Sequence, residues 1–292
     1  MNNINDIKKS RGSHYTQSNV VEEVIKNSDK RLAVVTVGCQ SEAIDLLVKR
    51  GIIPRPKYVI GLICERQYSI NIIDEFSKGK KIKYYRARDK IVGGWPGNVR
   101  IVTTDDKDYS YDRNERYLIN DYYQHYRCMQ CADMNNVNAD IICGDPWCYL
   151  ERDGLEKLKR GYTVVYPRSE KANQLVLSAS NDGYIQIKKD NARPFLNENL
   201  VGYNFAGRAF LAHQIAKREG LPCLYDDEMT PSAELTDSEV ISKYNRWCLY
   251  SFRSNLANNK FEFNKIVNEE KKKDRIKVIK YRVKNAIKRI LN

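Results

Sequence analysis

Residues 32–51, LAVVTVGCQSEAIDLLVKRG, decide the fold class of this chain. Their first six residues are apolar or β-branched, a composition typical of a buried parallel strand. The apolar run stops at Gly38-Cys39, and Ser41 is a residue type that caps helices. Apolar residues then recur at helical spacing, and Gly51 is expected to end the helix. The stretch predicts a strand–helix unit of an α/β fold, with a cysteine at the junction.

The same pattern continues along the chain. Residues 58–63 predict a second strand that ends at Cys64, residues 68–76 a helix, and residues 81–87 a third strand. Alternating strands and helices with short connections predict a parallel sheet with right-handed crossovers. The Gly-rich segment 93–97 then breaks the alternation, and shorter hairpin-like segments follow.

The remainder of the chain predicts a mixed arrangement of strands and helices. We expect strands at 140–144, 162–166 and 184–188, a turn at 181–183, and helices at 170–178 and 206–217. The predicted fold class is therefore α/β with mixed α+β character. It has a parallel sheet in the N-terminal part, then a mixed sheet with flanking helices, and a C-terminal basic amphipathic helix.

We predict three parts of the chain from these patterns. Residues 1–110 form an N-terminal α/β part that carries Cys39 and Cys64, and residues 111–260 form a second domain that carries a Cys-x-x-Cys motif. Residues 261–292 form a charged, helical tail.

Composition narrows the class of protein. The 292 residues are 42% apolar and 30% charged, which is typical of a globular chain. No apolar run approaches 18 residues, and the N-terminus lacks the apolar region of a secretory signal. We therefore expect a cytoplasmic protein. A peripheral position at the inner face of the membrane is a second expectation that is compatible with the first.

The positive charge lies mostly in the tail. Residues 271–292 contribute +9 to the formal net charge of +13, so the rest of the chain is nearly balanced. A nucleic-acid-binding surface over the whole fold is therefore not expected. Apolar residues at helical spacing in the tail predict a basic amphipathic helix: Ile276, Ile279, Val283, Ile287 and Ile290. Such a helix suits an anionic membrane surface, or it packs on the fold with a solvated basic face.

Eight cysteines in a chain without a secretory signal favour metal or redox use over a disulfide framework. Cys39 and Cys64 each follow a predicted parallel strand, at the sheet edge where ligands bind in open α/β folds. Cys128-Met-Gln-Cys131 adds two thiols at a chelating spacing. Four such thiolates suit tetrahedral zinc or a [4Fe–4S] cluster, and a dithiol is the third alternative. The other four cysteines have apolar or aromatic neighbours and are expected in the core: Cys143, Cys148, Cys223 and Cys248.

Several motifs in order resemble one flavoprotein family. Residues 128–133, CMQCAD, and 139–147, ADIICGDPW, are similar to the C-x-x-C-x-D and A-D-I-x-x-G-D-x-W patterns of the coenzyme F420-reducing hydrogenase and dehydrogenase beta subunits. Residues 161–168, GYTVVYPR, and 12–18, GSHYTQS, resemble further family segments. Residues 88–95 are similar to members that are encoded beside polysaccharide-synthesis genes.

This resemblance implies an iron–sulfur flavoprotein that holds FAD and a [4Fe–4S] cluster. The residues that match the cluster ligands are Cys39, Cys64, Cys128 and Cys131. Those that match the flavin cleft are Gly12, Ser13, Tyr15, Gln17, Ser18, Asp133, Gly144 and Asp145. His14 lies within the same segment, where we expect a hydrogen-bonded loop histidine rather than a proton donor.

The function implied is that of an oxidoreductase. It would pass electrons between the cluster, FAD and an organic substrate or deazaflavin, because the cofactors carry the chemistry and the protein orients them. The implied partners are a ferredoxin or a partner subunit, and the substrate is a small molecule or glycan intermediate. The alternative is a zinc-bearing or metal-free binding or assembly protein on the same scaffold, which serves glycan biosynthesis at the membrane.

Overall fold

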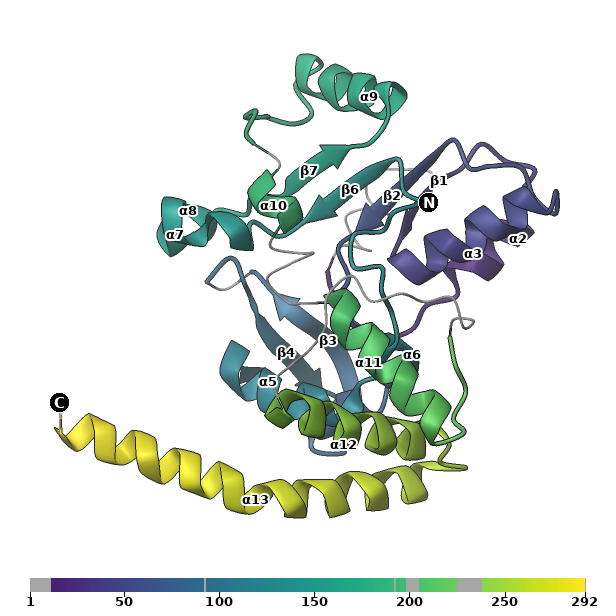
Figure 1. Ribbon diagram of the computed structural model, residues 1–292. Coiled ribbons are helices and arrows are strands. Elements are labelled where there is room, and N and C mark those ends of the chain that lie inside the picture. The colour runs from purple at the N-terminus through teal and green to yellow at the C-terminus, as the bar shows by residue number, and fades with distance from the viewer. Residues whose placement is uncertain (1–11, 92, 192, 198–204, 225–237, 292) are drawn as a thin grey trace.

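Two β-sheets organise the computed structural model, which describes residues 12–91, 93–191, 193–197, 205–224 and 238–291 (Figure 1). The first sheet has the strand order β1-β2-β6-β7. Its strands are β1 (Ala33–Thr36), β2 (Tyr58–Leu62), β6 (Ile141–Gly144) and β7 (Val164–Pro167). The first three of these are parallel, and β7 is antiparallel to β6. The predicted mixed α/β class is confirmed.

The second sheet is an antiparallel meander of β3 (Ile82–Asp89), β4 (Asn98–Thr103) and β5 (Asp108–Tyr111). The prediction that residues 81–87 continue the parallel sheet is therefore wrong. Strand β3 pairs with β4 rather than with β2, and the segment between β3 and β4 makes a hairpin because it is shorter than the dozen or more residues of a parallel crossover. The neighbour of β2 is β6, and Ile60 of β2 pairs with Ile141.

The first helix of the parallel unit starts earlier than the sequence suggests. Helix α3 runs over Gly38–Lys49 with Val37 as its N-cap residue, and the Gln40 side chain accepts a hydrogen bond from Val37 N at 3.1 Å. Ser41 is not the cap, because its hydroxyl donates to Gly38 O at 2.9 Å within the helix. Cys39 consequently lies in the first turn of α3.

Two further predictions differ from the structure. Helix α4 spans only Ile72–Ser77, because Tyr68 forms bridges with Thr16 and Gln124 instead of entering the helix. Residues 184–188 form no strand; they are exposed and pair with no other strand of the described chain. The turn before them is present, with Gly183 at φ +76°.

The remaining helices cover the two sheets. Helices α2 (Val20–Lys26) and α3 pack on β1, and α9 (Glu170–Asn181) follows β7. Helices α11 (Phe205–Arg218), α12 (Ser238–Asn255) and α13 (Lys260–Leu291) lie along the side that carries the second sheet (Figure 1). The shorter helices are α5 (Arg113–Asn120), η1 (Asp121–Tyr123), α6 (Tyr126–Met129), η2 (Trp147–Tyr149), α7 (Leu150–Asp153), α8 (Leu155–Leu158) and α10 (Arg193–Asn197).

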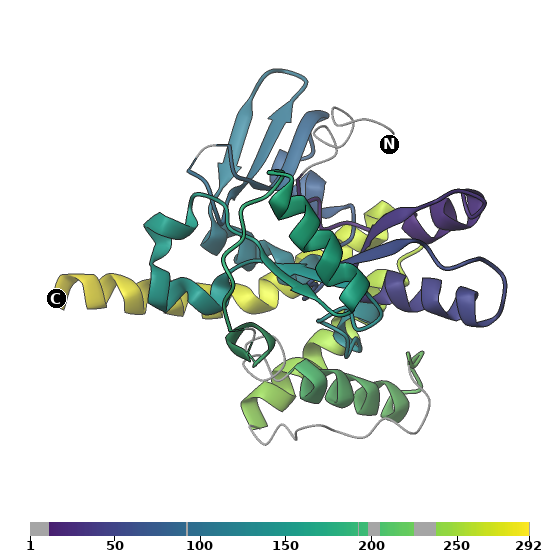
Figure 2. The same ribbon diagram turned by 90° about the horizontal axis from the view of Figure 1, so that it is seen from above.

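Helix α13 has two unlike halves. Its first turns bury Phe263 and Val267 in the core of the second sheet, and Lys271 pairs with Glu75 at 2.6 Å. Farther along, Ile279 is 51% exposed and Val283 52% exposed. Both views show this end extending past the other elements (Figures 1 and 2). Within the described part of the chain, no helix is both long and apolar enough to cross a membrane.

The two halves of α13 predict unequal effects of the same substitution. Val267→Ala should lower the free energy of unfolding by about 1–3 kcal/mol, because it leaves a cavity where the side chain is 1% exposed. Val283→Ala should change it by less than about 0.5 kcal/mol, since that side chain is half exposed. Chemical denaturation followed by circular dichroism measures both, and equal effects would contradict this account of the packing.

Candidate functional site

The four cysteines singled out in the sequence lie near one another, although they come from three separate segments. Cys39 is in the first turn of α3, Cys64 follows the end of β2, and Cys128 and Cys131 are in and just after α6. The thiols are close enough to affect one another electrostatically. Negative charge at the other three cysteines would raise the pKa of Cys64, after the larger effect of its own burial.

Burial disfavours the thiolate form of these four cysteines. It raises the pKa of Cys128 to about 11 and that of Cys131 to about 12, and it also raises the pKa of Cys39 and Cys64. Opposing contributions at Cys128 come from a hydrogen bond that Gln67 N donates to its sulfur at 3.4 Å, and from the charges of Arg66 and Arg127. Buried thiols with nearby positive charge and amide donors suit metal ligation, in which thiolate formation is coupled to metal binding.

Four cysteines are the donor set of either a tetrahedral zinc ion or a [4Fe–4S] cluster. Among the described residues, no three or more His, Cys, Asp or Glu side chains are arranged to hold one metal ion. A tetrahedral zinc draws its four sulfurs to within about 4 Å of each other, because each Zn–S bond is about 2.3 Å. A [4Fe–4S] cluster takes the same four cysteines with one sulfur on each iron, so its ligands stand farther apart. Four thiols that lie near one another match either centre in donor type and number.

A buried asparagine holds the Cys-x-x-Cys segment against the first sheet. Asn136, which is fully buried, donates to Thr36 O at 2.9 Å and accepts a hydrogen bond from the Ser41 hydroxyl. Its close approach depends on Gly61 of β2, where a Cβ atom would lie 2.5 Å from the Asn136 side chain. These contacts join the segment after Cys131 to the end of β1 and the start of α3, so they set the relative positions of the thiols.

Asp133 lies in this same segment. Its carboxylate accepts from Val137 N at 3.1 and 3.2 Å, and its carbonyl oxygen accepts from the Cys131 thiol at 3.7 Å. Gly38 permits the contact with α3, because a Cβ atom there would be 2.6 Å from Asp133 O. Asp133 therefore lies beside the thiols, and it is not among the residues that line the cavity at the carboxyl ends of β2 and β6.

A cavity of about 120 Å³ lies at the carboxyl ends of β2 and β6, between the first sheet, β3 and α5. Ligands of open α/β sheets bind at this edge. The polar and charged residues that line it are Glu65, Arg66, Arg88, Arg113, Arg116, Asn120 and Asp145. Its apolar and aromatic walls include Tyr15, Tyr68, Phe76, Tyr85, Tyr117, Trp147 and Phe195.

Some of the residues expected at the flavin cleft meet at this cavity. Tyr15 and Asp145 both line it and both bind Arg88: the guanidinium donates to the Tyr15 hydroxyl at 3.2 Å and forms an ion pair with Asp145. Gly144 lies beside it, since a Cβ atom there would be 2.9 Å from the Phe195 ring. Tyr15 has φ +58°, a backbone conformation that costs energy for a non-glycine residue and recurs at functional sites.

The others lie along the edge of β3 or near α3. Ser13 O accepts from Ala87 N at 2.8 Å, and Gly12 packs on Arg86. His14 Nε2 contacts the Arg86 guanidinium at 3.2 Å, and burial together with that charge lowers its pKa. The expected hydrogen-bonded loop histidine is thus confirmed. Ser18 accepts from the Gln40 side chain at 3.0 Å, and Gln17 precedes it.

The cavity and the thiols share one wall. Glu65 and Arg66 line the cavity, and together with Cys128 and Cys131 they also line a space of about 10 Å³. Cys64 immediately precedes this pair in the chain. Arg66 is held in place by Glu65, Asp121 and Gln124, the last two at 2.9 Å. A ligand in the cavity would therefore lie next to the thiols.

Most of the arginines of the cavity were not expected from the sequence. Arg113, Arg116, Tyr117 and Asn120 follow the i, i+3, i+4, i+7 spacing of one face of a helix, which was the available signal. The core prediction for the other cysteines is confirmed for Cys248, which is buried, and is wrong for Cys223, which is exposed. Cys143 and Cys148 are partly buried.

Comparison with known proteins gives two matches. A family model that describes the C-terminal region of the coenzyme F420 hydrogenase/dehydrogenase beta subunit matches residues 29–193. Among solved structures, a chain of the F420-reducing [NiFe] hydrogenase complex from Methanosarcina barkeri matches with a TM-score of 0.43 and 18% identity. That match covers 61% of this chain and 60% of the other. The matched family region contains all four clustered cysteines, and also Gly144 and Asp145.

Proposed function

Because this chain belongs to the coenzyme F420 hydrogenase/dehydrogenase beta-subunit family, we propose that it is an iron–sulfur flavoprotein subunit of an oxidoreductase. In this proposal, a [4Fe–4S] cluster bound by Cys39, Cys64, Cys128 and Cys131 passes electrons to or from FAD and an organic substrate or deazaflavin. The observation that carries the proposal is the shared wall: Glu65 and Arg66 line the cavity, and they also line the small space that Cys128 and Cys131 border.

The thiols and the cavity have different roles in this proposal. A bound cluster would supply one-electron transfer, and the protein would orient the electron donor and acceptor. Arg66, with its charge beside Cys128, favours the thiolate form, and the amide of Gln67 does the same by hydrogen bonding to sulfur. Asn136 and Asp133 hold the segment that carries the thiols.

The flavin part of the proposal rests on fewer observations. Tyr15 and Asp145 line the cavity, which supports a cofactor there. Sites for molecules of drug size usually enclose about 300–1,000 Å³. The described cavity, at about 120 Å³, therefore accommodates only a fragment of FAD.

The proposed partners are a ferredoxin or a partner subunit, and an anionic membrane surface for the projecting end of α13. The exposure of Ile279 and Val283 supports the membrane surface, because apolar side chains flanked by Lys and Arg suit an anionic lipid surface. The substrate in this proposal is a small molecule or glycan intermediate.

Metal and flavin analysis of an anaerobic preparation tests the proposed function. We expect a brown or yellow-brown protein with about four irons and one flavin per chain. A colourless protein with stoichiometric zinc, or with no metal, would overturn it in favour of a binding or assembly protein on the same scaffold.

A further inference from the structure

The cavity at the carboxyl ends of β2 and β6 contains more positive than negative charge. Four arginines and two carboxylates are among its described lining residues. Arg66 is paired with Glu65 and Asp121, and Arg88 with Asp145. Arg113 and Arg116 form no ion pair with any residue in the described part of the chain, so two charges face the cavity without a partner carboxylate.

Buried hydrogen-bond donors in the same place also lack partners. Arg116 is 7% exposed, donates from one terminal nitrogen to Ala87 O at 3.3 Å, and has no partner for Nε among the described residues. Arg88 is 8% exposed, and in the described part of the chain nothing pairs with its Nη2, although its other nitrogens bind Pro96 O, the Tyr15 hydroxyl and Asp145. Buried charged donors are nearly always satisfied, so an acceptor is expected here.

Two local features of the backbone direct these arginines toward the cavity. A register shift between Arg86 and Asp89 lets consecutive residues of β3, Ala87 and Arg88, line the same cavity, as bulges near binding sites often do. Helix α5 begins with a capping box between Asp112 and Glu115, which fixes the start of the helix whose one face carries the other two arginines.

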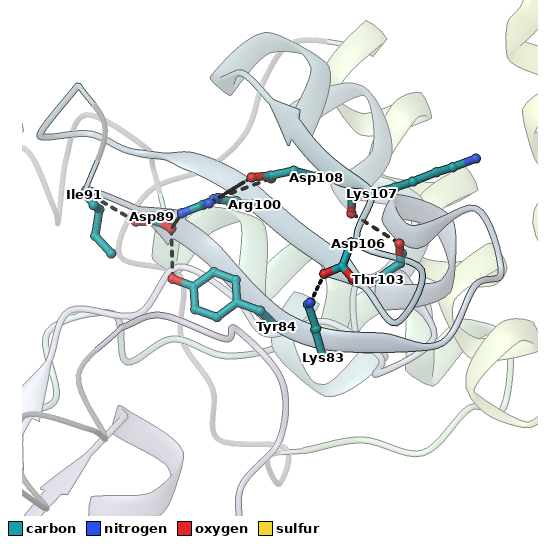
Figure 3. A network of polar contacts seen from close by, with 9 residues as sticks. All are labelled: Lys83, Tyr84, Asp89, Ile91, Arg100, Thr103, Asp106, Lys107 and Asp108. Carbon is teal, nitrogen blue, oxygen red and sulfur yellow. Dashed lines mark hydrogen bonds and ion pairs between the residues drawn. The ribbon is translucent and has the colours of Figure 1, made fainter.

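Arg100 in the second sheet is an example of an arginine whose charge is paired with carboxylates. Arg100 of β4 forms ion pairs with Asp89 at 3.6 Å and with Asp108 at 2.8 Å (Figure 3). Asp89 also accepts from the Tyr84 hydroxyl and from Ile91 N, each at 2.9 Å. This network satisfies its charges with the protein's own carboxylates, which is the arrangement that Arg113 and Arg116 lack.

We infer that this cavity binds the phosphate or carboxylate group of an organic ligand, with Arg88, Arg113 and Arg116 as the anion-binding residues. Guanidinium groups bind such oxyanions through paired N–H donors. The aromatic walls suit an apolar or ring-bearing remainder, and Arg113 lies 4.4 Å from the centre of the Trp147 ring, which holds it at the rim. The inference rests on the proposed function in one respect: the ligand is taken to be the substrate or cofactor of that function.

Calorimetric titration of the full chain with inorganic phosphate, pyrophosphate and malonate tests the inference. We expect saturable binding of at least one of these anions, and weakening by about tenfold or more in Arg113→Gln, which corresponds to about 1.4 kcal/mol. Arg113 is exposed, so its substitution should leave the fold intact. Arg116→Gln should weaken binding at least as much. The matched control is Arg253→Gln on α12, a surface arginine paired with Glu269, which should change affinity less than about twofold.

Two results would overturn the anion site: no saturable binding of any of the three anions by the unmodified protein, or equal affinity in Arg113→Gln and Arg253→Gln. Titration with flavin mononucleotide and with riboflavin distinguishes the two sources of the anionic group, a flavin phosphate and a substrate. Competition between phosphate and flavin mononucleotide, but not riboflavin, would assign the site to a flavin phosphate, and independent binding would assign it to a substrate. Iron content is measured on the same preparations, so loss of the proposed cluster and loss of the anion site are told apart.

Discussion

In the proposed function, replacing Cys128 by serine should remove the iron of the proposed cluster, from about four atoms per chain to well below one, together with the visible absorbance that this cluster would give. The Cys128 sulfur is buried beside the other three thiols and accepts a hydrogen bond from Gln67 N at 3.4 Å. A serine hydroxyl is a hard oxygen donor and does not replace the soft thiolate that iron–sulfur clusters require. Iron and acid-labile sulfide analysis of anaerobic protein, with an absorption spectrum, measures the loss.

The matched control is Cys223→Ser. Cys223 is exposed, and among the described residues its thiol donates to the nearby Leu221 O, at 3.6 Å. This variant should keep the iron content and spectrum of the unmodified protein. If Cys128→Ser kept its iron and colour, Cys128 would not be a ligand. If it lost stability with no change in any visible spectrum, a structural zinc or metal-free role would replace the cluster.

The second large effect is expected at Asn136. Asn136→Ala should lower the free energy of unfolding by about 3–5 kcal/mol, because it removes the hydrogen bonds of the buried Asn136 side chain to Thr36 O and from the Ser41 hydroxyl, and it places alanine at φ +55°. The contacts of this side chain join the segment after Cys131 to β1 and α3, so the iron content should fall in parallel. Urea denaturation of anaerobic protein measures the loss of stability.

Asn181→Ala provides the comparison. Asn181 is the last residue of α9 and is exposed, so its replacement should change the free energy of unfolding by less than about 0.5 kcal/mol. A loss below about 1 kcal/mol in Asn136→Ala would show that the buried hydrogen bonds do not hold the segment as described.

The local parts of the fold were predictable from the sequence. The strands at β1, β2, β6 and β7 and the helices α9 and α11 were all expected within a few residues of their observed bounds. Apolar and β-branched periodicity and the residues that end helices are local signals, so these elements could be found without knowing their neighbours. The errors were at positions where distant residues decide, such as Tyr68, which bridges to Thr16 and Gln124.

The pairing of strands was less predictable. The sequence suggested that β3 continues the parallel sheet, whereas β6 takes that place beside β2 and β3 begins a second, antiparallel sheet. Strand pairing depends on hydrogen bonds between segments that are far apart in the chain, and a strand's own composition does not specify its partner. The cavity exists because of this arrangement, since β3 and α5 form one side of it and the ends of β2 and β6 the other.

The sequence by itself identified the family and the four clustered cysteines. This was possible because each motif is a short stretch of the chain and its residue types indicate the chemistry directly. Only the tertiary structure decided that these thiols share a wall with a cavity, and that Arg113 and Arg116 face that cavity without a partner carboxylate in the described chain. An arginine on a helix carries the same charge wherever the helix lies. Whether that charge is solvated, paired or left to bind a ligand depends on what packs around it, and only long-range contacts determine that.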